Sequence, residues 1–190
     1  MGVLGTLSLA MGASWASGLR LYAAVGALGL LGRYAGLALP GELSVLTNGW
    51  VIGVALALYA VEFVADKVPL VDSAWDAVHT FVRIPAGAVL AAAAFGDFEP
   101  AVQVVALLAG GGLALTAHGT KAATRLVVNA SPEPVSNLVV STAEDGAALG
   151  TVALAAFAPV AAIVVVGVAV TASLAVLPRV WRRVRRRRAS

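Results

Sequence analysis

Cysteine is absent from the 190-residue chain, and charged residues are scarce. Without a thiol the chain can hold no disulfide, no cysteine nucleophile and no thiolate metal site. Charged residues make up 12% of the chain and hydrophobic residues 60%, whereas soluble domains have about 25% and about 45–50%. The mean hydropathy is +0.92. These proportions predict an all-α integral membrane protein, since helices satisfy their own backbone hydrogen bonds in lipid.

The sequence also lacks the motifs that usually mark enzymes. It contains no nucleophile elbow, P-loop, glycine-rich dinucleotide fingerprint or zincin motif. The glycine run at 110–112 lies inside an apolar segment, where close helix packing is its usual use. Only two histidines are present, His79 and His118, and a single membrane histidine is more often a packing residue than a catalyst. We therefore expect no enzymatic activity and no cofactor.

Basic residues are concentrated at the end of the chain, where seven arginines occur: Arg179, Arg182, Arg183 and Arg185 to Arg188. The rest of the chain has six basic and ten acidic residues, so the body of the protein is net acidic. A basic run directly after an apolar segment is typical of the cytoplasmic side of a membrane. We therefore predict that residues 179–190 form a cytoplasmic tail that binds anionic lipid headgroups. No aromatic or folded module accompanies the run, so no nucleic-acid partner is expected.

Six segments are candidates to enter a bilayer, for which a spanning helix needs about 20 apolar residues. They are residues 3–31, 45–64, 82–95, 101–128, 147–158 and 160–177. Gly18 and Arg20 interrupt the first segment, and Gly119, Lys121 and Arg125 interrupt the fourth. We therefore expect broken or re-entrant helices. Only Pro159 divides the last two segments, which leaves open one kinked helix or two short ones.

The two interruptions indicate an internal repeat. Residues 17–20 (SGLR) align with residues 118–121 (HGTK), so the predicted membrane domain, residues 1–178, divides into repeats at about 1–95 and 100–178. Three membrane segments per repeat make the repeats antiparallel, as in many transporters. Six crossings then return the chain to its starting side, which predicts that both termini are cytoplasmic. The alternative is chance, because Gly- and Ala-rich membrane sequences match one another easily.

Five polar blocks occur in a specific order: SGLRLY (17–22), EFVADKVPLVDSAWDAVHTFVR (62–83), AHGTKAATR (117–125), NASPEPVSN (129–137) and STAED (141–145). With the basic tail, this order resembles a family of bacterial multispanning proteins catalogued as domain of unknown function 4126. The resemblance covers nearly the whole chain. It implies a multi-pass protein of the bacterial inner membrane and says little about activity.

The stretch around residues 72–83 concentrates charge on one helical face. Asp72, Asp76, His79 and Arg83 follow the spacing i, i+4, i+7 and i+11, which aligns their side chains. One interpretation is an interfacial helix on the cytoplasmic surface, with Trp75 as an aromatic anchor and its charges in solvent. The other is a cation site, in which Asp72, Asp76 and His79 are weak metal candidates and a divalent cation is the ion they would hold.

Arg20, Lys121 and Arg125 lie within apolar segments, where an unpaired charge costs about 2.5–3.5 kcal/mol even on insertion scales. They need partners, and four carboxylates are the candidates: Glu62, Asp66, Glu144 and Asp145. Glu144 and Asp145 are expected in the first turn of a helix, where the helix dipole favours them. The pairs are either structural ion pairs or a site for an anionic substrate.

We hypothesise a small transporter or channel for an ion or small anionic solute, with these seven residues at the repeat interface. The alternative is a membrane scaffold or lipid-interacting accessory protein, whose charges are structural. A lipid-modifying enzyme that uses Asp72, Asp76 and His79 is the least favoured hypothesis. Expected partners are membrane lipids and a second copy of the chain.

Overall fold

The computed structural model describes residues 1–128 and 134–188, and every regular element in these ranges is a helix. The helices are α1 (Val3–Tyr34), the 3₁₀ helix η1 (Gly41–Thr47), α2 (Gly49–Ala65), α3 (Pro69–Ala94), α4 (Pro100–Val128), α5 (Pro134–Phe157) and α6 (Pro159–Arg188). The prediction of an all-α protein is therefore confirmed for the described part of the chain. The helix α6 includes most of the arginine-rich tail, while residues 129–133 of the NASPEPVSN block lie outside the described residues.

Local sequence explains where most helices begin. Proline is the first residue of four helices, where its fixed φ suits a helix and its missing N–H costs no hydrogen bond: Pro69, Pro100, Pro134 and Pro159. Helix α2 begins after Asn48, whose side-chain oxygen accepts a hydrogen bond from the Trp50 backbone N–H at 2.9 Å. The prolines and this cap divide the apolar sequence into separate helices.

Four helices are long and apolar enough to cross a membrane: Ala74–Ala94, Pro100–Leu126, Val135–Phe157 and Pro159–Arg179. The pair η1 and α2, bent by 73° at their junction, is a fifth candidate if it forms one broken span. These candidates rest on length and composition. They support a multi-pass membrane protein, but the predicted six crossings are not confirmed.

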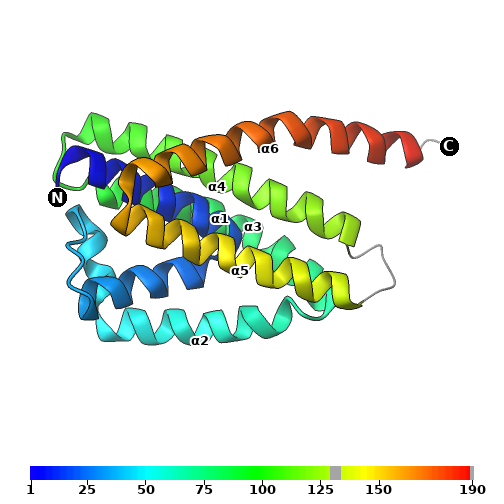
Figure 1. Cartoon of the computed structure of the whole chain (residues 1–190), viewed down its shortest axis with the longest axis horizontal. Helices are drawn as coiled ribbons and strands as arrows, with labels where there is room; N and C mark the ends of the chain where they lie inside the picture. The colour runs from blue at the N-terminus through cyan, green and yellow to red at the C-terminus, as the bar shows by residue number, and fades with distance from the viewer. Residues whose placement is uncertain (129–133, 189–190) are drawn as a thin grey trace.

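Helix α1 is broken at Arg20, whose backbone angles are non-helical at φ −146° and ψ 80°. Before the break, the Ser8 hydroxyl donates to the carbonyl of Ala155, near the end of α5, at 3.1 Å. After the break, Gly29 packs against Leu46 of η1. Figure 1 shows the two ends of α1 at the same end of the bundle, with the break pointing into it. The expectation of a broken helix is met by α1.

The break in α1 affects where the two ends of the chain lie. In Figure 1, α2 to α6 alternate in direction along the long axis, and the two termini lie at opposite ends of the molecule. The prediction that both termini share one side required α1 to cross as well. Helix α1 instead turns back at Arg20, so that its two ends lie at the same end of the bundle.

The contacts between α1 and α4 do not support the inverted repeat. Leu7 and Met11 lie with Val102 and Val105 along one pocket, and further along both helices Gly18 packs against Ala114. The first half of α1 therefore runs parallel to α4, whereas equivalent helices of inverted repeats run antiparallel. Helix α4 also continues without a break through its predicted interruption at residues 119–125. The predicted equivalence of the two interruptions is not confirmed.

Two predicted boundaries differ from the structure. Residues 147–177 form parts of two helices, because α5 ends at Phe157 and α6 begins at Pro159. Helix α5 starts at Pro134, well before the predicted boundary at residue 147. Glu144 and Asp145 therefore lie about three turns inside α5 and not in its first turn, so the dipole argument for these residues was wrong.

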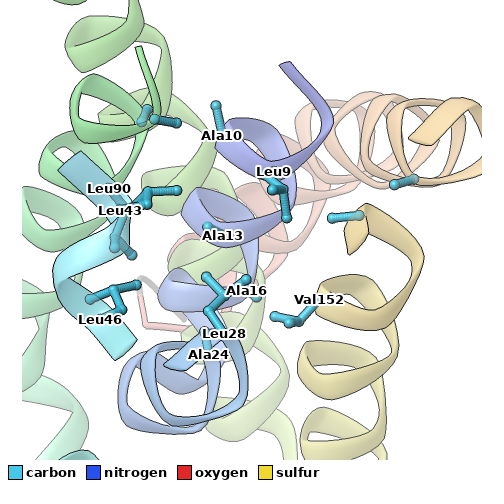
Figure 2. Close-up of a cluster of buried hydrophobic side chains, with 14 of the residues drawn as sticks. Leu9, Ala10, Ala13, Ala16, Ala24, Leu28, Leu43, Leu46, Leu90 and Val152 are labelled. Carbon is cyan, nitrogen blue, oxygen red and sulfur yellow. The ribbon is translucent and has the colours of Figure 1, made fainter. Parts of the chain in front are cut away.

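The apolar core surrounds the first half of α1. Figure 2 shows Leu9, Ala13 and Ala16 of this helix between Leu43 and Leu90 on one side and Val152 of α5 on the other. The residues that face α1 are mostly small, so the helices approach closely. Gly18 is one such position, because a Cβ there would overlap the Ala114 carbonyl oxygen of α4. This packing fixes where the break at Arg20 lies relative to α3, α4 and α5.

Candidate functional site

Helix α3 turns its charged face towards the protein. Asp72 and Arg83 are 0% exposed, and Asp76 and His79 are 7% and 6% exposed. The opposite face is apolar and open, with Phe81 83% exposed. The predicted surface helix with solvated charges is therefore wrong. Its amphipathic pattern was correct, but in a membrane the apolar face turns to lipid and the polar face turns inward.

Arg20 lies at the break of α1 and reaches two other helices. Its guanidinium pairs with Asp66, which caps the end of α2, and its Nε lies 3.0 Å from an oxygen of Asp145 on α5. Nη2 donates to the hydroxyl and the carbonyl of Ser141, at 3.0 and 3.1 Å, and lies 3.4 Å from Glu144. The break in α1 thus places a fully buried guanidinium between α2 and α5.

Asp66, like Glu144, contacts three of the four basic residues. One of its oxygens contacts Arg20, Lys121 at 3.1 Å and Arg125 at 3.7 Å. Lys121 is also 2.9 Å from Asp76 of α3, so its ammonium links α2, α3 and α4. The predicted ion pairs of Arg20 and Lys121 with internal carboxylates are present.

Arg125 of α4 has the most regular geometry in the site. It forms a bidentate pair with Glu144, with Nε and Nη2 at 3.0 and 2.7 Å from the two oxygens. Its Nη1 lies 3.6 Å from Asp72 and contacts the side-chain oxygen of Asn137. The Asn137 amide donates to the Asp66 carbonyl at 3.1 Å, which satisfies the end of α2.

A fourth cation extends the site towards the middle of α3. Arg83 pairs with Glu62 of α2 and with Asp76, 2.6 Å away on its own helix. Its Nη1 lies 3.5 Å from Nδ1 of His118, whose other ring nitrogen is 2.7 Å from the Thr80 hydroxyl. We call the ten residues joined by these ion pairs the buried network: Arg20, Glu62, Asp66, Asp72, Asp76, Arg83, Lys121, Arg125, Glu144 and Asp145.

The metal candidates separate into two groups. Asp72 and Asp76 each offer an oxygen that lies within 4.8 Å of an oxygen of Asp66, with all three residues buried. His79 is engaged elsewhere: one ring nitrogen is 3.1 Å from the Tyr22 hydroxyl and the other 2.8 Å from the Trp75 carbonyl. Within the described residues Asp66 therefore takes the place that the sequence assigned to His79.

A comparison with protein-family models shows the relationship of the chain. The model described as Domain of unknown function (DUF4126) matches residues 7–179. The chain belongs to this family. The match confirms the resemblance seen in the polar blocks. No curated protein and no solved structure matches the chain.

All seven residues predicted for the site of this DUF4126 protein belong to the buried network: Arg20, Glu62, Asp66, Lys121, Arg125, Glu144 and Asp145. Sequence reasoning missed three contributors. Arg83 lies on the helical face of Asp76, which one interpretation of the sequence places in solvent. Asn137 and Ser141 are distinguished in the sequence only by their places in the NASPEPVSN and STAED blocks.

A pocket with both apolar and polar lining borders the buried network of the DUF4126 protein on one side. It has a volume of about 220 Å³ and lies between α3 and α4. Asp76 and Thr80 line it from α3, and His118 and Arg125 line it from α4. Since one water occupies about 30 Å³ of liquid volume, the pocket has room for several waters. Asp76 and Arg125 are the members of the buried network that border it.

Proposed function

We propose that the protein is a small multispanning transporter or channel for a cation and that the buried network is its ion site. The observation that supports this most directly is the charge of the network. Its ion pairs join six carboxylates with four basic side chains, an excess of two negative charges when all are ionised. Because uncompensated charge is costly inside a membrane protein, such an excess favours a bound cation. The earlier hypothesis of an anionic solute is disfavoured by the same excess.

The break in α1 supports an ion site at this place. Transporters commonly bind their ions where a helix is interrupted, since the freed backbone and the adjoining side chains can line a polar cavity. Arg20 lies at such an interruption and contacts Asp66, Asp145 and Glu144. A shift of the two halves of α1, which meet at Arg20, would move this residue relative to α2 and α5. This movement would alter the charge that balances the carboxylates.

Lys121 is positioned to exchange with a transported cation. Its ammonium contacts both Asp66 and Asp76, so a cation that binds these carboxylates competes with it directly. Displacing Lys121 removes one positive charge from the network, and the bound cation replaces it. Binding and release would therefore couple to the position of Lys121 and of α4.

We further propose that α2 to α6 cross the bacterial inner membrane five times, while α1 enters and leaves on one side. Seven arginines in the tail favour the cytoplasm for the end of α6. With five crossings, the N-terminus would then lie on the opposite side, which replaces the expectation of two cytoplasmic termini. We propose no enzymatic activity for the protein.

Reconstitution into proteoliposomes tests this function. The wild-type chain should conduct or exchange cations across the vesicle membrane, as reported by trapped pH- and cation-sensitive dyes. Asp66→Asn should abolish the flux, because Asp66 contacts three of the basic residues. Asp97→Asn is the matched control, since Asp97 is exposed in the connection between α3 and α4, and it should keep wild-type flux.

Absence of flux from folded wild-type protein would contradict the transporter and favour the scaffold. The extensive pairing of the four basic residues is the observation that supports this second candidate, because a purely structural network would also pair them. A scaffold predicts that deletion of residues 182–190 weakens binding to vesicles with anionic lipids. It also predicts that the Asp66→Asn variant differs from wild type in stability alone.

A further inference from the structure

We propose that Asp66, Asp72 and Asp76 bind a hard divalent cation of the Ca²⁺, Mg²⁺ and Mn²⁺ class. This inference rests on the proposed function and names the substrate class of its site. The three residues come from two elements that meet at the connection between α2 and α3. Asp66 follows the last residue of α2, and Asp72 and Asp76 lie in the first two turns of α3.

The spacing of the carboxylates fits such an ion. One oxygen from each residue lies within 4.8 Å of the other two. Oxygens on opposite sides of an ion are about 4.2 Å apart for Mg²⁺ and up to about 5.2 Å apart for Ca²⁺. The three oxygens can therefore surround Ca²⁺ with little movement, whereas Mg²⁺ requires them to close in or to bind through water.

Unsatisfied oxygen atoms are the second observation that points to a ligand. Asp66 pairs through Oδ2 and Asp76 through Oδ1. The other oxygens, Asp66 Oδ1 and Asp76 Oδ2, are buried and have no hydrogen-bond partner among the described residues. A buried acceptor without a partner is costly, so native structures rarely leave one without water or an ion. In each of the two carboxylates, one oxygen pairs with basic side chains and the second oxygen is available to a bound ion.

The charge of the surroundings is consistent with a divalent ion. The buried network carries two more carboxylates than basic side chains. Lys67, at the edge of the network, lies over the Phe63 ring at 3.4 Å from its centroid, and including it leaves an excess of one. A divalent cation therefore compensates the excess without creating a large opposite charge.

The carboxylate oxygens of the three aspartates indicate which class of ion the site would bind. All three carboxylates supply hard oxygen ligands, which suit Ca²⁺, Mg²⁺ and Mn²⁺. Zn²⁺ and Cu²⁺ prefer nitrogen or sulfur, but the chain has no cysteine and both histidines have other partners. His79 is held by Tyr22 and Trp75, and His118 by Thr80 and Arg83. Water from the pocket beside Asp76 can complete the coordination shell.

Binding of Mn²⁺ to the full-length protein in detergent micelles tests the site. Electron paramagnetic resonance should show one bound Mn²⁺ per chain, displaced by Ca²⁺. Asp66→Asn, Asp72→Asn and Asp76→Asn should each weaken the affinity at least 10-fold. Asp97→Asn and Glu99→Gln, which change exposed carboxylates at the other end of α3, should leave it unchanged. Circular dichroism checks that each variant is folded.

The outcomes separate this site from the proposed function. If the folded wild-type protein binds no Mn²⁺, the proposed site is wrong. This outcome does not depend on whether the Asn variants fold. Equal binding by the three variants and the wild type also overturns it. Mn²⁺ binding without any cation flux supports the site and contradicts the transporter. Cation flux without Mn²⁺ or Ca²⁺ binding supports the transporter and contradicts this site.

Discussion

Replacement of Arg83 by methionine should destabilise the protein strongly, because it leaves Glu62 buried without its counterion. Both side chains are 0% exposed, and the ion pair of Glu62 among the described residues is with Arg83. Arg83 also pairs with Asp76, but Lys121 still contacts that carboxylate at 2.9 Å. Removal of one partner from a buried ion pair costs about 3–5 kcal/mol. We therefore expect the free energy of unfolding to fall by about 3–5 kcal/mol.

A double-mutant cycle with Glu62→Gln separates the pair from the packing of the arginine stem. The double variant should lose less stability than the sum of the two single variants, with a coupling of about 1–3 kcal/mol. Chemical unfolding in detergent micelles, followed by circular dichroism, measures each variant. Arg33→Met is the control, since Arg33 is exposed and donates one hydrogen bond to the Thr47 carbonyl. It should cost about 1 kcal/mol or less.

A loss of less than about 1 kcal/mol for Arg83→Met would refute the reasoning. Glu62 would then have to be neutral or hydrated in the folded protein, and the buried network would not be a set of paired charges. A coupling near zero, with a large loss for Arg83→Met alone, would instead assign the effect to packing.

Other changes test the packing and the topology. Gly18→Val should destabilise the protein by about 1–3 kcal/mol or more, because the valine side chain would overlap the Ala114 carbonyl. Gly119→Ala should be neutral or stabilising, because a Cβ at this position only contacts Leu177, at 3.6 Å. Equal effects of these two changes on the unfolding free energy would contradict the close approach of α1 and α4. Reporter fusions should place the end of the chain in the cytoplasm and the N-terminus on the opposite side, and two cytoplasmic signals would contradict the five crossings. Deletion of residues 182–190 should weaken binding to anionic vesicles in a flotation assay while cation flux per inserted protein persists.

The sequence identifies most members of the buried network because charge in an apolar segment is costly. Arg20, Lys121 and Arg125 stand out against their neighbours, and few carboxylates are available to pair with them. The same argument predicts salt bridges without any knowledge of the fold. It cannot identify the partners, because Glu62 pairs with Arg83, a residue that one interpretation of the sequence places in solvent.

Long-range packing explains what the sequence could not predict. The spacing of Asp72, Asp76 and Arg83 defines one helical face, but the pattern is the same whether that face meets water or another helix. A glycine beside a charge marks a possible break, yet α1 breaks at Arg20 while α4 continues through Gly119. The difference depends on contacts with α2 and α5 that are distant in sequence. Asp66 becomes a shared carboxylate for the same reason.

Anomalous X-ray diffraction from crystals grown with Mn²⁺ locates a bound ion relative to the buried network. We predict one strong peak at about 2.0–2.6 Å from an oxygen of each of Asp66, Asp72 and Asp76. A map without a peak at these residues, in crystals soaked well above the concentration that saturates binding in solution, would contradict this prediction.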